Sequence, residues 1–579
     1  MRPTSHVRAC PQYCRHAIDS AKARPSIIRS SLRAALLVVT AGLTAGVSAN
    51  PATEWTVVAK GQYASDVLIP GWPQDEDPYH QNWEERDIRL SDTGQQRIHL
   101  SVLRNGAIEL WRSAPSGLAL YASVDSDAET GPSRTGSEAG HVFRSLFEQP
   151  VDMGGHGVIA FSGRAGPPAP TALDFATYGL WLATPDGNVE IARGRNYVTG
   201  QTANPLDPGT GNLRFSTSGN FVKKVWMLDD DLVLFAATIV NPDTATSRLA
   251  LVRHLRGVGN QICAISGEYL GQVVPFSDWQ VQVSRGGEIY VDSQNYGHGF
   301  WRICEGPGIP LVKENATGLL GPGLPSPTAY FPYPTVGLQQ FAVSDTGSII
   351  FGGRVSDSTA GAWTGSGIFR NTPTGNQPLA LTNVLGPWGS GLPEMPFKSL
   401  SAYNSPKISG EYALFGATVQ TQASEVEGLW RILPNGTVEA AALEGTAEDG
   451  LSPEPGKVWG TLTAHDAGIY SNGDIVLKAS ARPDAHDALW LLRPGAEPQR
   501  LLSIGDTIKI PTAAGMTDAT VNSFMPANPF SRGDEAADAA MGSDGSLLLK
   551  VYVSQPRLGP VFVLRQLGVS EDIFMNGFE

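Results

Sequence analysis

The stretch that decides the fold runs from Ser344 to Thr382 and reads SDTGSIIFGGRVSDSTAGAWTGSGIFRNTPTGNQPLALT. A turn tripeptide, Asp345-Thr346-Gly347, precedes an apolar run that ends at Phe351. A polar, Gly-rich segment leads to a second apolar pair, Ile368-Phe369, and a Gly-Asn turn precedes a third run at 379–381. Short apolar runs bounded by Gly, Asn, Asp and Pro, without a 3.6-residue period, predict antiparallel β-structure.

This unit recurs along the whole chain. The turn and its apolar run return as SDTGQQRIHLS (91–101), GGHGVIAFSG (154–163), DDDLVLFAA (229–237), RGGEIYVDS (285–293), SGEYALFGA (409–417), SNGDIVLKA (471–479) and SDGSLLLKV (543–551). The second run of each copy carries an aromatic or apolar anchor: Trp111, Trp181, Leu251, Trp301, Phe369, Trp430, Trp490 and Phe562. Successive anchors lie between 50 and 72 residues apart, which is the period of a solenoid, propeller or array.

The length of the repeat selects the architecture. A repeat of about 60 residues with three or four short strands is too short for an immunoglobulin-like domain, which has about 100 residues. It has the right length for a four-stranded propeller blade. We therefore predict an all-β propeller of about eight blades. Seven blades is the alternative, because the spacing between Leu251 and Trp301 is short. The predicted blades cover about 84–135, 143–206, 212–274, 275–327, 331–394, 397–457, 459–516 and 519–567.

The two ends of the repeat region complement each other. Residues 54–62, EWTVVAKGQ, read as the last strand of a repeat that lacks its earlier strands, whereas the final copy stops at Val561 to Leu564 without such a strand. Pairing these segments would close the ring and remove exposed sheet edges. The propeller would then comprise residues 50–567, with 568–579 as a tail.

The first 49 residues have the features of a secretory signal. Seven basic residues precede the apolar run from Ala34 to Ala45, and Val47-Ser48-Ala49 provides small residues for cleavage. The apolar run is shorter than the roughly 20 residues of a membrane span, although a retained anchor is the alternative. We expect a secreted, periplasmic or cell-surface protein that has no transmembrane segment once the signal is removed.

The composition indicates which classes of binding partner the protein can have. The net charge of −14 and the pI of about 5.2 argue against nucleic-acid binding, which requires a basic surface. The interpretation that remains is a monomer that binds a polysaccharide or a surface protein.

Four cysteines are present, and Cys10 and Cys14 would leave with the signal. Cys263 and Cys304 remain in two successive repeats. A pair of cysteines in an exported protein predicts a disulfide, here between blades, with two buried thiols as the alternative.

No strong catalytic motif is present. The chain contains no H-E-x-x-H, P-loop or G-x-S-x-G sequence, and it predicts no cofactor and no assignable catalytic residue. Asp125, Asp127 and Glu129 partly match a calcium loop, which needs oxygen ligands at alternate positions, but the Gly falls one place late. Among possible binding residues, the segment 71–85 contains three aromatic side chains that could stack on a sugar or a peptide: Trp72, Tyr79 and Trp83.

The recurring [ND]-x-x-G-x-[IV]-x-F unit, followed by G-[LI]-[WF], resembles bacterial exported proteins with tandem NxxGxxxF repeats and various C-terminal anchors, whose function is largely unassigned. The resemblance covers roughly residues 54–567. The ending IFMNGFE (573–579) is similar to the IFxxGFE ending of many secreted gammaproteobacterial proteins. The pattern departs from the family at Asp231, Arg285 and Gly410, where the leading Asn or the Gly is replaced or shifted.

Two function classes follow. The first, which the sequence favours, is an exported binding or surface-structural protein that recognises a polymer or a protein through loops at the rim. The second is a carbohydrate-active hydrolase or lyase with carboxylates and aromatics at the mouth of the funnel. Fold alone does not separate them.

Overall fold

A computed structural model describes residues 55–567 apart from a series of segments, of which the longest are 68–87, 195–205, 268–280 and 527–539. By compactness the chain divides into residues 1–49 and residues 50–579. The predicted signal segment and the C-terminal tail lie outside the described residues.

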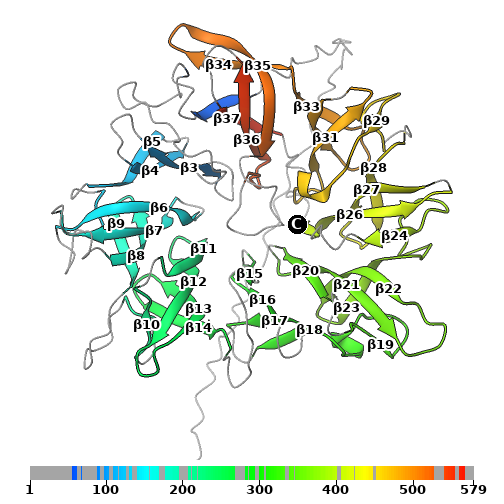
Figure 1. Ribbon diagram of the computed structural model, residues 1–579, viewed down its shortest axis with the longest axis horizontal. Helices are drawn as coiled ribbons and strands as arrows, with labels where there is room; N and C mark the ends of the chain where they lie inside the picture. Colours follow the sequence, from blue (N-terminus) through cyan, green and yellow to red (C-terminus); the bar gives the residue numbers. More distant parts are fainter. Residues whose placement is uncertain are drawn as a thin grey trace, which may run out of the picture. The chain divides into compact units, whose positions relative to one another are not determined.

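The described residues form eight antiparallel sheets of four or five strands that follow one another around a common centre (Figure 1). The first sheet along the chain contains β2 (Ile88–Leu90), β3 (Arg97–Val102), β4 (Ile108–Ala114) and β5 (Gly117–Ser123). The second contains β6 (Val142–Met153), β7 (Ile159–Gly166), β8 (Thr177–Thr184) and β9 (Gly187–Arg193). The third contains β10 (Arg214–Phe215), β11 (Val222–Asp229), β12 (Leu232–Asn241), β13 (Thr246–Leu255) and β14 (Gly259–Ile265). The fourth contains β15 (Val281–Val283), β16 (Ile289–Ser293), β17 (Gly299–Ile303) and β18 (Ile309–Lys313).

The remaining four sheets repeat the pattern. The fifth contains β19 (Ala329–Tyr330), β20 (Leu338–Val343), β21 (Ile349–Asp357), β22 (Gly365–Thr372) and β23 (Gly375–Leu381). The sixth contains β24 (Phe397–Leu400), β25 (Lys407–Ser409), β26 (Tyr412–Gln420), β27 (Glu425–Ile432) and β28 (Val438–Leu443). The seventh contains β29 (Val458–Trp459), β30 (Ala467–Ile469), β31 (Ile475–Arg482), β32 (Asp487–Leu492) and β33 (Gln499–Ser503). The eighth contains β34 (Thr507–Thr512), β35 (Gly515–Pro526), β36 (Ser546–Ser554), β37 (Pro560–Gln566) and β1 (Thr56–Lys60).

The core lies between consecutive sheets. Leu180 and Leu182 of β8 pack in one buried cluster with Val225 of β11 and Phe235 of β12, which belong to the next sheet. Because each sheet is covered on both faces, its central strands carry continuous apolar runs instead of an alternating pattern. This arrangement confirms the predicted all-β propeller.

The ring closes through the N-terminal strand, as the sequence predicts. In β1, Thr56 lies opposite Leu564 and Val57 opposite Val563 of β37, and Lys60 lies opposite Val561. The strand therefore occupies the outer place that the last sheet otherwise lacks, and it pairs an edge that would be exposed.

Each sheet also carries a feature that the sequence did not indicate. The pairing between its last two strands shifts by one residue, which is the signature of a β-bulge. The extra residues of the eight bulges are Val58, Tyr121, Ile191, Cys263, Leu311, Leu379, Ala441 and Leu501. Apart from Cys263, all of them have apolar or aromatic side chains.

Within the described part of the chain, helical structure amounts to short 3₁₀ turns such as η4 (Gly318–Leu320) and η5 (Ala464–Asp466). None of it is long and apolar enough to cross a bilayer.

Candidate functional site

The recurring turn of the sequence motif brings one backbone conformation to the same end of successive sheets. Its glycine has a positive φ, a region that other residues rarely adopt. Glycines in this conformation are Gly157, Gly287, Gly347, Gly410, Gly473 and Gly545. We call the surface formed by the turns 284–288, 344–348, 409–412, 470–474 and 542–546 the turn face.

On the turn face, each turn docks on the preceding sheet. Gly347 lies so close to Glu288 that an added Cβ would stand 2.0 Å from a carboxylate oxygen. The Tyr290 hydroxyl donates to Glu288 Oε2 at 2.6 Å and lies 3.2 Å from the Gly347 carbonyl oxygen. Arg302 Nη1 lies 2.8 Å from Glu288 Oε1. Burial, together with the bond to Glu288, raises the pKa of Tyr290, so the phenol stays protonated.

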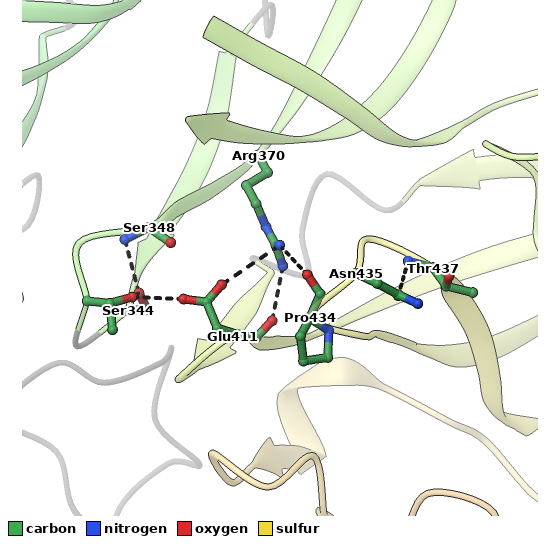
Figure 2. Close-up of polar contacts among 8 residues, drawn as sticks. Ser344, Ser348, Arg370, Glu411, Pro434, Asn435 and Thr437 are labelled. Atoms are coloured by element: carbon green, nitrogen blue, oxygen red, sulfur yellow. Dashed lines mark hydrogen bonds and ion pairs between the residues drawn. The ribbon is translucent and has the colours of Figure 1, made fainter. Parts of the chain in front are cut away.

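Between the fifth and sixth sheets, the link is made by Arg370, which follows the aromatic anchor of β22 (Figure 2). Arg370 Nη1 donates to the Pro434 carbonyl at 3.2 Å, and Nη2 donates to the Glu411 carbonyl at 3.0 Å. The Glu411 carboxylate accepts a hydrogen bond from Thr346 at 3.1 Å, and Ser344 bonds the same hydroxyl at 2.9 Å. One guanidinium thus joins the fifth sheet to two turns of the sixth.

A second arginine makes the same kind of connection one sheet further on. Arg431 of β27 donates to the Leu492 carbonyl at 2.8 Å and pairs with Glu439 at 2.5 Å. Its side chain is 3% exposed. Since a buried guanidinium without acceptors would be costly, the two Nη bonds compensate part of that cost and hold neighbouring sheets together.

Toward the outside of the ring, asparagines hold the loops that connect one sheet to the next. Asn188 Nδ2 donates to the carbonyls of Tyr121 and Gly131, and Asn260 Nδ2 donates to those of Ile191 and Asp207. Asn376 Nδ2 repeats the contact with the Gly321 carbonyl at 2.8 Å. In the sequence these asparagines belong to a Gly-Asn dipeptide that begins the last strand in three copies, which indicates a turn but not the partner of the Asn side chain.

The fourth sheet contains a buried carboxyl group with altered acidity. Glu314, directly after β18, is 4% exposed and is influenced by the charge of Asp292 in β16. Burial and, second, that negative charge raise the pKa of Glu314 from 4.5 to about 7. A carboxyl group of this kind can hold or release a proton near neutral pH.

The structure brings the two predicted cysteines together without joining them. Cys263 lies in β14 of the third sheet and Cys304 follows β17 of the fourth, and both are half-buried. Their side chains are within hydrogen-bond reach, and this contact lowers the pKa of Cys263. The predicted disulfide is not formed in this structure.

Most of the other predicted residues lie outside the described part of the chain. Trp72, Tyr79 and Trp83 lie outside the described residues, as do Asp127 and Glu129. Asp125 is described, and its carboxylate accepts a hydrogen bond from Arg144 at 2.8 Å. Among the residues that the structure describes, no three His, Cys, Asp or Glu side chains form a group that could hold a metal ion.

Comparison with known proteins identifies no family for this chain. No family model matches the chain, and no curated protein does. Among solved structures, the chain is similar to the β-propeller domain of the Trilobed protease from Pyrococcus furiosus, with 8% identity over 75% of this chain and 99% of that chain and a TM-score of 0.29.

Two other similar structures come from different classes of protein. An alpha-L-arabinanase from Penicillium chrysogenum shares 9% identity over 89% of this chain and 98% of its own, with a TM-score of 0.21. The WD40 domain of SCAP from fission yeast shares 10% over 88% and 94%, with a TM-score of 0.31. Scores this low carry no argument about function, so the fold assignment depends on the strand topology, and the resemblance to NxxGxxxF repeat proteins stays a prediction.

Proposed function

We propose that this chain is an exported binding or surface-structural protein whose propeller is a rigid scaffold for ligand-binding loops. The observation that carries the proposal is that polar side chains at the turn face form hydrogen bonds between neighbouring sheets. Arg370, Arg431 and Tyr290 each hydrogen-bond from one sheet to a backbone carbonyl of the next. Buried hydrogen bonds of this type keep a scaffold in one geometry, which lowers the entropy lost when its loops bind a partner.

The proposed ligand is a polysaccharide or a surface protein. The net charge of −14 disfavours a polyanion such as nucleic acid. The aromatic side chains of Trp72, Tyr79 and Trp83 are the proposed contacts, since aromatic faces stack on sugar rings and fill pockets at protein interfaces.

An array of glycans, cell-wall fragments and surface proteins tests the proposal. Purified full-length protein should bind a defined subset, and replacing the three aromatic residues by Ala should weaken that binding at least tenfold. Val258→Ala is the matched control, because Val258 is 78% exposed and lies away from the proposed contacts in sequence. Equal loss in the control, or no binding to any class, would contradict the proposal.

A second function, a carbohydrate-active enzyme, is favoured by Glu314 and Asp292. Glycoside hydrolysis requires a general acid whose pKa is raised toward neutral pH, and burial and the charge of Asp292 raise the pKa of Glu314 in this direction. Product analysis on each glycan that binds separates the two functions. For an enzyme, Glu314→Gln should abolish product formation while binding persists; for a binding protein, no product forms with either chain.

A further inference from the structure

Cys263 occupies a position where the other seven sheets carry apolar or aromatic side chains. It is the extra residue of the β-bulge between β13 and β14, and its counterparts include Ile191 and Leu311. A bulge residue of this series faces the following sheet: Ile191, for example, packs in the cluster that contains Phe235 of the next sheet. The bulge therefore directs the Cys263 thiol toward the fourth sheet.

Cys304 is a second departure from the repeat pattern. It stands three residues after the anchor Trp301, where the other seven copies have Ala114, Thr184, His254, Thr372, Leu433, Arg493 and Arg565. Its φ is +78°, an uncommon conformation for a residue other than glycine. Two cysteines that replace ordinary residues in adjacent repeats thus meet across one boundary between sheets.

The surroundings suit thiol chemistry. Both residues are half-buried, so neither is sealed completely inside the core. Both cysteines pack against one apolar cluster, which Leu228, Leu249 and Trp301 also contact. The hydrogen bond from Cys304 and, more weakly, the positive charge of Arg253 favour the thiolate form of Cys263, while burial opposes it.

We propose that Cys263 and Cys304 form a reversible redox site that links the third and fourth sheets, with Cys263 as the attacking thiol and Cys304 as the resolving thiol. In the first step the Cys263 thiolate attacks one sulfur of a small-molecule disulfide and displaces the other as a thiolate. In the second, the Cys304 thiolate attacks Cys263 Sγ and displaces the second small thiol. The protein loses two electrons, the reagent gains them, and the two thiol protons pass to the two released thiols.

The test uses oxidised glutathione on the full-length chain, followed by non-reducing proteolysis and mass spectrometry. Wild type should yield a peptide pair that joins Cys263 to Cys304, and its thermal midpoint should rise on oxidation and return with dithiothreitol. Cys304→Ser should stop at one glutathione on Cys263. Cys263→Ser should react at least tenfold more slowly at Cys304. The double variant, Cys263→Ser with Cys304→Ser, measures the glutathione that reacts with Cys10 and Cys14, and this amount is subtracted.

The result can go against the proposal in several ways. Wild type that accumulates glutathione without the cross-linked pair would overturn the site, and equal rates for the two single variants would overturn the assigned order. If either variant fails to fold, the test is cross-link formation in the wild-type protein alone. A cross-link that forms only in urea overturns the proposal. A cross-link that forms in native buffer and responds to the glutathione redox ratio supports it.

Discussion

Gly318 and Gly323 lie in the same loop between the fourth and fifth sheets and have nearly the same backbone conformation, with φ of +64° and +66°. Their surroundings differ. A Cβ on Gly318 would meet nothing within 4 Å, whereas one on Gly323 would stand 1.7 Å from the Asn376 carbonyl oxygen. The pair therefore separates the energy of an unusual φ from that of close packing between sheets.

We expect Gly323→Ala to lower the free energy of unfolding by about 3 kcal/mol or more, and Gly318→Ala by about 1 kcal/mol. The smaller loss reflects only the positive φ, while the larger includes displacement of a backbone carbonyl. Urea denaturation of both variants measures the difference. Equal losses would show that the loop does not pack against Asn376 as described.

At the same scale, Glu314 predicts a pH dependence of stability. Its pKa in the folded protein is about 7, above the ordinary value of 4.5, so the folded state holds the proton more tightly. The stabilisation is complete below about pH 4.5 and is lost as pH rises through 7, by at most about 3.5 kcal/mol, since one pKa unit corresponds to about 1.4 kcal/mol.

Replacing Glu314 by Gln should remove this part of the dependence, because Gln mimics the protonated carboxyl at every pH. The measurement is the difference in unfolding free energy between Glu314→Gln and wild type at pH 4.5, 6 and 7.5. Asp292→Asn should reduce the slope by lowering the pKa of Glu314. A difference that does not vary with pH would argue against a buried, protonated Glu314.

At the scale of elements, the sheets are held together by side chains that reach the next copy of the repeat. The interactions of Arg370 with the Pro434 and Glu411 carbonyls join residues 64 and 41 positions apart. The residue itself is 8% exposed, and burial lowers its pKa. A lysine would supply only one compact donor group in place of the planar fork, so it should not restore both bonds.

Arg370→Met should therefore lower the free energy of unfolding by about 1–3 kcal/mol, and Arg370→Lys should recover little of the loss. Arg354→Met is the matched control, because Arg354 is exposed on β21 of the same sheet. Its effect should stay within about 0.5 kcal/mol. Thermal denaturation checks both, and similar losses at the two positions would contradict the role of Arg370.

At the scale of the whole molecule, closure depends on β1. Val57 and Ala59 are 3% and 1% exposed, so removing residues 50–62 would uncover both a sheet edge and apolar core. We expect the truncated protein to lose cooperative unfolding and to aggregate, as measured by calorimetry and light scattering. A truncation that melts like the full chain would remove closure as a source of stability.

A cross-link tests the register directly. Thr56 lies opposite Leu564, so Thr56→Cys combined with Leu564→Cys should form a disulfide, since paired positions lie within the roughly 7 Å that the bond allows between Cα atoms. Each single variant is a control, because neither should give the cross-linked peptide. The linked protein should resist aggregation better than its reduced form.

The sequence by itself determined that the strands are antiparallel, that the unit repeats, that the sheets form a propeller and that an N-terminal strand closes it. Each of these depends on local patterns, such as an apolar run after a Gly-containing turn, or on counting copies. The Val57 to Val563 pairing was predictable because one end had a spare strand and the other lacked one.

Only the tertiary structure decided which side chains act between sheets. Arg370 and the bulge at Cys263 look ordinary in the sequence, and the Gly-Asn dipeptide at Asn376 does not show what the Asn side chain binds. The partners of Arg370 and Asn376 lie in another copy of the repeat, and the bulge at Cys263 becomes visible only in the pairing of the strands. Glu314 is of the same kind, since its acidity depends on burial and on Asp292 across the sheet. Contacts between residues far apart in sequence depend on exact distances and solvent exclusion, and neither is set by local strand preference.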